Sequence, residues 1–168
     1  MRIISGTYKS RKITTDPKAS FRPTSARVRK SLFDLLGPVS GLSILDLFAG
    51  SGILGFEAMS RGGSKLSSVE MNTKYVKLIR QNAVELGVEC DVIKKDAFTY
   101  LKTCPQFDII FADPPYGNTD LQLLLELCLN KLHKGGRLVI ESSKHDLELD
   151  GGKVKEYGDT RLTIFTHE

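Results

Sequence analysis

Short apolar segments alternate with longer amphipathic segments through most of the chain after Gly41. The short segments have the length of buried strands, whereas the longer ones carry apolar residues at helical spacing. Repeated strand–helix–strand order predicts a parallel sheet with helices on both faces. The predicted strands are residues 43–47, 66–70, 91–94, 107–112 and 137–141, and the predicted helices are residues 53–61, 73–86, 97–102 and 121–132.

The end of the chain breaks this alternation. Two β-prone segments, residues 153–156 and 160–166, flank Tyr157-Gly158-Asp159, which predicts an antiparallel hairpin. We therefore predict an α/β fold with a doubly wound, mostly parallel, seven-stranded Rossmann-like sheet and a C-terminal antiparallel hairpin. At 168 residues, the chain has room for one compact domain and little more.

The first forty residues follow a different pattern. β-prone pairs at Ile3-Ile4 and Ile13-Thr14 flank Gly6 and a basic turn, which predicts a hairpin. Residues 16–21 are typical of a loop. Arg22-Pro23-Thr24 ends this loop with a proline and a capping hydroxyl, so a helix is predicted to begin there.

The helix after Thr24 is predicted to pack one face and expose the other. Val28, Leu32, Leu35 and Leu36 recur at helical spacing, and Gly37-Pro38 ends the pattern. The basic residues of the segment fall elsewhere on the helix and are expected to stay exposed: Arg27, Arg29 and Lys30.

Positive charge is concentrated at the start of the chain. Residues 1–30 contain nine Lys or Arg and one Asp, a net charge of +8, whereas the whole chain carries +4, which leaves −4 for the remainder. A basic arm on a mildly acidic body favours contact with a nucleic acid, because neutralised phosphates release counterions. The alternative is a solvated basic tail. We predict that residues 1–40 form an RNA-contacting extension of a main domain, residues 41–168, with these candidate contacts: Arg2, Lys9, Arg11, Lys12, Arg22, Thr24, Arg27 and Arg29.

The cysteines and the apolar segments bear on the compartment. Cys90, Cys104 and Cys128 are well separated and lack the spacing of a metal site or redox motif. The start of the chain has no apolar leader, and polar residues interrupt the longest apolar stretch, residues 121–132. We expect a reduced, cytoplasmic protein with no membrane association.

A glycine-rich turn follows the first predicted strand and opens directly into a helix. Residues 46–55 are Asp-Leu-Phe-Ala-Gly-Ser-Gly-Ile-Leu-Gly, and such a turn can face either a dinucleotide pyrophosphate or the methionine portion of S-adenosylmethionine. The carboxylate of Asp46 favours the methyl donor, because it would repel a pyrophosphate but can accept hydrogen bonds near a sulfonium and an amino group. The candidate cofactor contacts here are Asp46, Phe48, Ala49, Gly50, Ser51 and Gly52.

Acidic residues also follow the second and third predicted strands. Glu70 can accept hydrogen bonds from both ribose hydroxyls. Met71 offers a polarizable surface to adenine, and Asp96, followed by Ala97, can accept from the adenine amino group. Each has a structural alternative: Met71 fills the core, Asp96 caps a helix, and the glycines turn a corner. Their coincidence at the ends of three strands favours a cofactor site.

The fourth predicted strand delivers Asp113-Pro114-Pro115-Tyr116 to the same edge of the sheet. An aromatic amino group is a poor nucleophile because its lone pair is delocalised, so a site must hold the nitrogen in line with the donor methyl. The Asp113 carboxylate and the Pro114 carbonyl can each accept an amino hydrogen, and Tyr116 can stack on an unpaired base. The alternative is a strand ended by Pro-Pro, with Asp113 and Tyr116 bonded locally.

Together these residues resemble the RsmD family of bacterial methyltransferases, and the resemblance spans nearly the whole chain. The glycine-rich turn and residues 113–116 alone indicate only a broad amino-methyltransferase class. Two further motifs narrow this class to the RsmD family: Arg22-Pro23-Thr24 and Tyr157-Gly158-Asp159-Thr160. The other motifs that carry the resemblance are Arg2-Ile3-Ile4-Ser5-Gly6, Arg27-Val28-Arg29, Leu32-Phe33, Glu57-Ala58, Ser60-Arg61-Gly62 and Phe107-Asp108.

The resemblance implies a class I methyltransferase fold and methyl transfer from S-adenosylmethionine to the N2 of a guanine in small-subunit (16S) ribosomal RNA. It also implies action on a ribosomal assembly intermediate that contains ribosomal proteins, and we expect a monomer. Lys30 stands where Glu is more frequent in the family, and Asn72 where Asp is common, so that helix face and the cofactor edge match less well. The implied contacts are Asp46, Gly50 and Gly52 for the methionine end, Glu70 for the ribose, Asp96 for the adenine, and Asp113 to Tyr116 for the guanine.

Two other functions remain open. An adenine-N6 DNA methyltransferase would also act on an exocyclic amine, and an RNA-binding assembly factor could keep the fold without catalysis. The intact residues 113–116 argue against the second, and the lack of an obvious sequence-reading domain argues against the first. Asp46, Asp96 and Asp113 also suggest a metal cluster, but they belong to separate strands and no His joins them, so we expect no metal.

Overall fold

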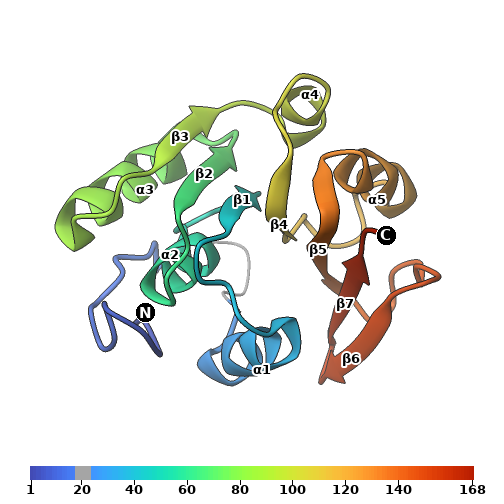
Figure 1. Cartoon of the computed structure of the whole chain (residues 1–168), viewed down its shortest axis with the longest axis horizontal. Helices are drawn as coiled ribbons and strands as arrows, with labels where there is room; N and C mark the ends of the chain where they lie inside the picture. Colours follow the sequence, from blue (N-terminus) through green and yellow to red (C-terminus); the bar gives the residue numbers. More distant parts are fainter. Residues whose placement is uncertain (18–23) are drawn as a thin grey trace.

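The structure, a computed structural model, describes residues 1–17 and 24–168, and this part of the chain contains a seven-stranded sheet between two layers of helices (Figure 1). The strands are β1 (Ser43–Leu47), β2 (Lys65–Glu70), β3 (Asp91–Lys94), β4 (Phe107–Ala112), β5 (Leu132–Ser143), β6 (Lys153–Tyr157) and β7 (Thr160–Thr166). Their order across the sheet is β3-β2-β1-β4-β5-β7-β6. Strands β1 to β5 are parallel to one another, whereas β7 is antiparallel to both β5 and β6. The predicted doubly wound sheet with a C-terminal antiparallel hairpin is confirmed.

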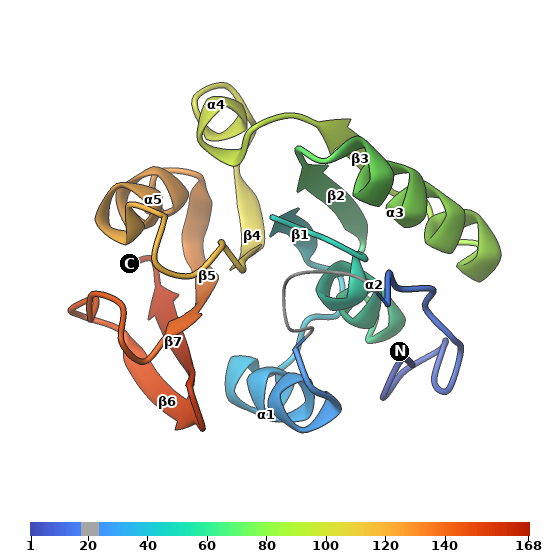
Figure 2. The same cartoon turned by 180° about the vertical axis from the view of Figure 1, so that it is seen from behind.

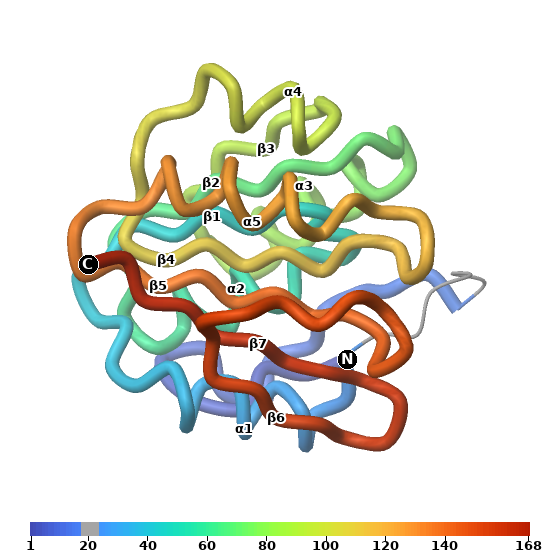
Figure 3. Tube along the Cα trace, turned by 90° about the vertical axis from the view of Figure 1, so that its right-hand side faces the viewer, coloured from blue at the N-terminus to red at the C-terminus, as the bar shows by residue number. Residues whose placement is uncertain are grey.

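Alternate residues of the central strands point into two separate cores, because successive side chains of a strand face opposite sides of the sheet. On β4, Ile109 and Phe111 join one core, and Ile110 and Ala112 join the other. The helices are α1 (Ala26–Leu36), α2 (Ile53–Ser60), α3 (Thr73–Leu86), α4 (Ala97–Leu101) and α5 (Leu121–Leu129). The first core takes residues from α1, α2 and α3, and the second from α4 and α5. Figure 3 shows α5 and α1 on opposite sides of the strands.

The sheet order reverses direction between β1 and β4, and this reversal positions the site. From β1 the chain runs outward through β2 and β3, then returns to place β4 on the other side of β1. Leu47, the last residue of β1, is level with both Val69 and Ala112. The segments that follow β1, β2 and β4 therefore leave the sheet together, at the edge where doubly wound sheets bind ligands.

The predicted boundary between the last helix and the fifth strand was wrong. The helix expected over residues 121–132 ends at Leu129, and β5 begins at Leu132 rather than residue 137. Leu132 pairs with Phe107, and regular pairing resumes between Arg137 and Ile109 after a register shift. Gly135 and Gly136 lie within this irregular stretch, as glycines often do where strand pairing is interrupted.

Residues 1–14 fold back on themselves without forming regular strands. Antiparallel pairing within them is limited to one isolated bridge between Arg2 and Lys12, although Ile3 also donates its N–H to the Arg11 carbonyl over 3.0 Å. The hairpin expectation is therefore correct for the chain reversal and wrong for the strands. Both Ile3 and Ile13 are buried in the core that contains α1 and α2, so this segment packs as part of the main structure.

Helix α2 holds the N-terminal segment through a buried carboxylate. Glu57 accepts hydrogen bonds from the N–H of Ile4 at 2.8 Å and of Ser5 at 3.1 Å, and from Arg61 Nε at 2.9 Å. A Cβ on Gly6 would lie 1.8 Å from the carbonyl oxygen of Ser60, so only glycine fits there. These contacts give a structural reason for the motifs around Gly6, Glu57 and Ser60. Figure 2 shows the segment beside α2 and the end of α3.

Helix α1 differs from the prediction in three ways. Its cap is Ser25, whose hydroxyl accepts from the Val28 N–H at 3.3 Å, while the Thr24 hydroxyl donates elsewhere. Arg29, expected on an exposed basic face, is 2% exposed and donates to the carbonyls of Thr24 at 2.8 Å and Arg2 at 2.9 Å. Leu35, expected to pack, is exposed instead.

None of the helices within residues 1–17 and 24–168 is long and apolar enough to cross a membrane.

Candidate functional site

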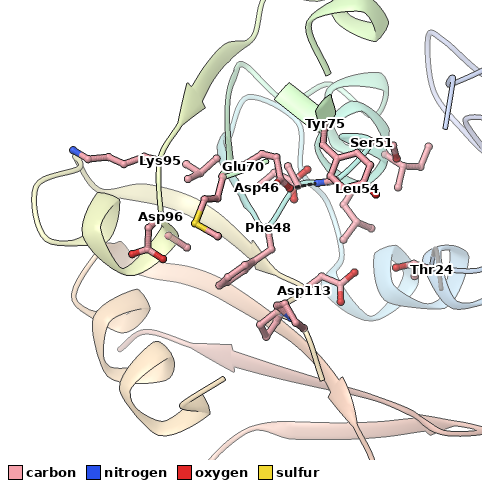
Figure 4. A pocket seen from close by; sticks show the side chains of 18 of the residues that line it. Thr24, Asp46, Phe48, Ser51, Leu54, Glu70, Tyr75, Lys95, Asp96 and Asp113 are labelled. Carbon is pink, nitrogen blue, oxygen red and sulfur yellow. Dashed lines mark hydrogen bonds between the residues drawn. The ribbon is translucent and has the colours of Figure 1, made fainter. Parts of the chain in front are cut away.

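A cavity of about 580 Å³ lies at the edge of the sheet where β1, β2 and β4 end (Figure 4). This volume is typical of sites for small molecules and cofactors. Nearly all of the predicted cofactor and catalytic residues line it, and Gly52 is the predicted cofactor contact outside this set. The predicted residues that line the cavity are Thr24, Asp46, Phe48, Ala49, Gly50, Ser51, Glu70, Met71, Asp96, Ala97, Asp113, Pro114, Pro115 and Tyr116.

The turn after β1 has the backbone geometry that its glycines predict. Gly50 has a φ of 55° and Gly52 a φ of 80°, in the left-handed region that glycine adopts at no steric cost. Gly52 is the N-cap of α2, and a Cβ there would lie 2.6 Å from the Phe56 ring. Phe48 also has a positive φ, of 57°, which is uncommon for a non-glycine residue. Gly52 therefore shapes the turn, and Phe48 and Gly50 present it to the cavity.

Asp46 is buried in the floor of this turn. Its Oδ2 accepts a hydrogen bond from the Gly55 N–H at 3.1 Å, and a Cβ on Gly55 would lie 3.0 Å from that oxygen. Burial raises the pKa of Asp46 to about 7; the Gly55 N–H opposes this rise and the charge of Glu70 adds to it. A cationic or hydrogen-donating group placed in the cavity would therefore strongly stabilise the ionised form of the Asp46 carboxyl.

Glu70 joins two segments of the cavity wall. Its Oε2 accepts from the Gly50 N–H at 3.0 Å, and its Oε1 accepts from the Asn72 N–H at 2.8 Å. Asn72 in turn caps α3 by accepting from the Lys74 N–H at 2.9 Å. A carboxylate oxygen can accept more than one hydrogen bond, so these contacts leave Glu70 able to accept from ligand hydroxyls as well.

Met71 and Asp96 also line the cavity. Met71 is 68% exposed and lines the cavity, which excludes the alternative that it fills the core. Asp96 does cap α4, because its Oδ1 accepts from Thr99 N at 2.8 Å and Thr99 Oγ1 at 2.9 Å. The capping alternative and the cofactor expectation are compatible, since both bonds use one oxygen of a carboxylate that also borders the cavity.

The segment after β4 forms the opposite wall. Asp113, Pro114, Pro115 and Tyr116 all border the cavity that the glycine-rich turn enters, and Figure 4 places Asp113 across Phe48 from Asp96. Tyr116 is 42% exposed, and its hydroxyl donates to Glu141 Oε1 at 3.1 Å, with Thr160 Oγ1 at 3.3 Å. The tip of the Tyr116 ring is thereby fixed while much of the ring stays accessible.

Two carboxyl groups at this wall influence each other. Burial, followed by the charges of Glu141 and Asp46, raises the pKa of Asp113 well above its usual range. Burial also raises the pKa of Glu141, although hydrogen bonds from Thr24 and Tyr116 oppose this rise. The pair consequently retains a proton more readily than two exposed carboxyl groups would. Within the described residues, no group of three or more His, Cys, Asp or Glu is placed to hold a metal ion.

Sequence reasoning missed several residues of the site. Glu141 ends a predicted strand beside β4 and is 4% exposed, so it carries the same signal, an acidic residue at the carboxyl end of a buried strand, that identified Asp46 and Glu70. Tyr75 lies in the first turn of α3, directly after the segment that Glu70 holds, and its hydroxyl lies 3.5 Å from Asp16 Oδ2. The further lining residues are Ile53, Leu54, Val69, Tyr75 and Lys95.

The candidate RNA contacts are not gathered around the cavity. Arg2, Lys9, Arg11 and Lys12 are exposed, and Arg11 donates to the carbonyl of Glu85, near the end of α3 remote from the cavity. Arg27 is exposed on α1, Thr24 borders the cavity, Arg29 is buried, and Arg22 lies outside the described residues.

The N-terminal segment nevertheless reaches the cavity by running along α3. Lys74, in the first turn of α3, forms an ion pair with Asp16 at 2.5 Å, whereas the Arg11 contact is at Glu85. An α-helix rises about 1.5 Å per residue, so these two contacts are roughly 16 Å apart along the helix axis.

Comparisons with known proteins agree with this arrangement. A family model described as Conserved hypothetical protein 95 matches residues 1–166. A Haemophilus influenzae protein named Ribosomal RNA small subunit methyltransferase D is 34% identical over 157 residues, which are 89% of this chain and 81% of that protein. An Escherichia coli K12 protein of the same name is 36% identical over 146 residues, with 84% and 71% covered. The solved structure of a hypothetical protein from Thermus superposes with a TM-score of 0.87 and 32% identity, covering 98% of each chain.

Proposed function

Because the chain belongs to the RsmD family of methyltransferases, whose model is described as Conserved hypothetical protein 95, we propose that it methylates ribosomal RNA with S-adenosylmethionine as the methyl donor. In its full form, the proposal is methyl transfer to the exocyclic N2 amine of a guanine in small-subunit (16S) ribosomal RNA. The proposed substrate is an assembly intermediate of the small subunit, in which ribosomal proteins accompany the RNA.

One observation carries this proposal. The glycine-rich turn after β1 and the Asp113–Tyr116 segment after β4 border one continuous cavity of about 580 Å³. A methyl donor held by the first can therefore face an amino group held by the second. Such an arrangement supplies the alignment on which a direct methyl displacement depends.

The charge of the cavity favours a cationic ligand. Four carboxyl groups border it, and among the described lining residues Lys95 is the one Lys or Arg. A pyrophosphate would meet repulsion there, whereas S-adenosylmethionine carries a sulfonium and an ammonium group. We assign Asp46 and Gly50 to the methionine portion, with Gly52 shaping their turn, Glu70 to the ribose hydroxyls, and Met71, Asp96 and Ala97 to the adenine.

The acceptor base is assigned to the opposite wall. S-adenosylmethionine supplies an electrophilic methyl group. The Asp113 carboxylate and the Pro114 carbonyl accept the two hydrogens of the guanine amino group, which localises the nitrogen lone pair and directs it at the methyl carbon. Tyr116 stacks on the base, which has to be unpaired to enter. The bond from nitrogen to the methyl carbon would form as the carbon–sulfur bond breaks, with S-adenosylhomocysteine as the leaving group. The nitrogen would then lose one proton to solvent, so Asp113 need not act as a strong base.

The position of the basic residues supports a large, structured substrate. Residues 1–40 are proposed as the RNA-contacting extension. Its exposed Arg11 contacts Glu85 near the end of α3 away from the cavity, and Arg2, Lys9 and Lys12 are exposed in the same N-terminal segment. Phosphates that meet these side chains are separated from the target base by about the length of α3. A folded RNA within a particle presents both at once, whereas a short oligonucleotide does not.

The test is incubation with labelled S-adenosylmethionine and unmodified small-subunit particles, naked 16S RNA or duplex DNA, followed by nucleoside mass mapping. We expect label as N2-methylguanosine, with particles the preferred substrate. Label as N6-methyladenine would overturn the choice of base, and label in DNA would support the adenine-N6 DNA alternative.

The non-catalytic alternative predicts RNA binding without any label. Asp113→Ala is expected to abolish transfer while cofactor affinity and the thermal unfolding midpoint stay close to those of the wild type. If Asp113→Ala loses both folding and transfer, the loss of transfer reflects a structural defect. Asp113→Asn then separates the role of Asp113 in folding from its role in transfer, because Asn keeps one acceptor oxygen and the side-chain volume.

A further inference from the structure

The carboxylate of Glu141, near the end of β5, accepts hydrogen bonds from two other side chains. Its Oε2 accepts from the Thr24 hydroxyl at 2.9 Å, and its Oε1 accepts from the Tyr116 hydroxyl at 3.1 Å. The side chain is 4% exposed and is not among the residues that line the cavity, whereas both of its partners are. Glu141 is therefore placed to act on the site through Thr24 and Tyr116 rather than by direct contact with a ligand.

Three distant parts of the chain meet at this carboxylate. Thr24 directly precedes the N-cap of α1, Tyr116 follows β4, and the Tyr116 hydroxyl also lies 3.3 Å from Thr160 Oγ1 at the start of β7. The segment that carries Tyr116 is otherwise exposed from Pro115 to Asn118. The contacts at the hydroxyl thus fix the free end of an aromatic ring whose backbone lies in an exposed loop.

We propose that Glu141 is a positioning residue that holds the Tyr116 ring in the plane on which the target base stacks, and joins this platform to the start of α1 through Thr24. This inference rests on the proposed function, because it concerns base binding at the same site. Stacking is sensitive to the plane of the ring, and a small displacement of the base moves its amino group out of line with the methyl donor.

The charge of Glu141 has a second effect at the same place. Glu141 is the first of the charged neighbours that raise the pKa of Asp113. Asp113 accepts amino hydrogens best when it is ionised. The charge of Glu141 therefore places the acid limb of the pH–activity profile at higher pH than it would have without that charge. Removing the charge while keeping the hydrogen bonds is expected to move that limb to lower pH.

Glu141→Gln and Glu141→Ala separate geometry from charge. Gln has one oxygen for the Tyr116 hydroxyl and an amide N–H for Thr24 Oγ1, so kcat is expected to stay within about threefold of wild type near neutral pH, with the acid limb shifted to lower pH. Ala removes both contacts, and kcat is expected to fall by about ten- to a hundredfold. The Kd of S-adenosylmethionine is expected to stay within about twofold in both variants, because Glu141 does not line the cavity.

A double-mutant cycle tests the route through Tyr116. Tyr116→Phe keeps the ring and removes the hydroxyl that Glu141 holds. If Glu141 acts through this hydroxyl, Glu141→Ala changes kcat far less in the Tyr116→Phe background than in the wild type. Fully additive losses, or a Glu141→Ala variant with wild-type kcat, would overturn the proposal. Glu126→Gln, an exposed carboxylate on α5, is the matched control and should leave kcat unchanged.

An NMR readout keeps this test independent of the proposed function. The aromatic signals of Tyr116 in tyrosine-labelled protein are assigned by their loss in Tyr116→Phe. They are expected to shift or broaden in Glu141→Ala and to change much less in Glu141→Gln. Unchanged Tyr116 signals in Glu141→Ala would refute the positioning role even if the wild type methylates RNA. If the Tyr116 signals change in Glu141→Ala but the wild type shows no turnover, the positioning role stands and the proposed function is refuted.

Discussion

The carboxylate of Glu70 accepts a hydrogen bond from the backbone N–H of Gly50, with 3.0 Å between Oε2 and the nitrogen. Its other oxygen accepts from the Asn72 N–H at 2.8 Å. One side chain therefore holds the glycine-rich turn after β1 against the turn that begins α3. The wall of the cavity formed by these two turns depends on Glu70 before any ligand arrives.

The first prediction concerns the loss of this carboxylate. Glu70→Ala leaves the Gly50 N–H without its partner and removes the proposed acceptor for the ribose hydroxyls. A hydrogen bond to a charged group contributes about 1.5–3 kcal/mol, so the affinity for S-adenosylmethionine is expected to fall by about ten- to a hundredfold. Isothermal titration calorimetry measures this change. Glu126→Ala, on the exposed face of α5, serves as control, and equal affinities in the two variants would contradict the role of Glu70.

The second prediction follows from the burial of Asp46. Burial raises its pKa to about 7 in the folded protein, whereas an Asp in the unfolded chain titrates near pH 4. Between these values the folded protein binds the proton more tightly than the unfolded chain does. The contribution of Asp46 to the free energy of unfolding therefore becomes less favourable as pH rises from about 4 to 7, and stays at its least favourable value above pH 7.

Asp46→Asn removes this titration and keeps an acceptor for the Gly55 N–H. The free energy of unfolding of Asp46→Asn relative to wild type is expected to rise by about 2 kcal/mol between pH 5 and pH 8. Urea unfolding at the two pH values measures it. The same variant should bind S-adenosylmethionine more weakly, because the proposed partner of the ligand's cationic groups is gone. A stability difference that does not change with pH would show that Asp46 titrates normally.

The central strands and the glycine-rich turn were predictable because their signals are local. The apolar residues of β4 run without interruption from Ile109 to Ala112, directly before Asp113. The positive φ angles at positions 50 and 52 are indicated by the glycines there. Residues that follow parallel strands share one edge of the sheet, so the cavity could be assembled from its strand ends.

The hydrogen-bond partners of the buried polar residues were not predictable, because these partners lie far away in the chain. Arg29 has the spacing of an exposed helical residue, and its burial depends on the Arg2 carbonyl, 27 positions earlier. Glu141 and Thr24 are 117 positions apart, and nothing in the local sequence of either indicates the other. Helical periodicity shows which face of α1 is apolar, but it does not show that the N-terminal segment covers part of the remaining surface.

The third prediction concerns the docking of the N-terminal segment at Gly6. Gly6 has a φ of 84° and Gly41 a φ of 76°, so alanine at either position meets similar backbone strain. A Cβ at Gly6 would lie 1.8 Å from the Ser60 carbonyl oxygen, whereas a Cβ at Gly41 has no heavy atom within 4 Å. Gly6→Ala is therefore expected to lower the free energy of unfolding by about 2 kcal/mol more than Gly41→Ala. Equal losses in urea unfolding would mean that the close approach to Ser60 contributes nothing.

The last prediction separates two arginines of α1 that look equivalent in the sequence. Arg29 is 2% exposed, and its guanidinium donates to the carbonyls of Thr24 and Arg2. Its Nε is a buried polar atom without a hydrogen-bond partner, and burial lowers the pKa of Arg29 while the charge of Glu57 raises it. Arg27 is exposed two positions earlier. The two side chains therefore differ in their surroundings: Arg29 is held inside the fold, whereas Arg27 is exposed and stays a proposed RNA contact.

Arg29→Ala is expected to lower the free energy of unfolding by about 2–4 kcal/mol, because it leaves two carbonyls without donors and opens a cavity. Arg27→Ala should change it by no more than about 0.5 kcal/mol. For RNA binding the order reverses: if Arg27 meets a phosphate, Arg27→Ala reduces the slope of log K against log salt concentration by about one, and Arg29→Ala leaves that slope unchanged at a temperature where it is folded. Urea unfolding and salt-dependent RNA titration measure both quantities. A reduced slope in Arg29→Ala with full stability would place its guanidinium on the RNA rather than in the core.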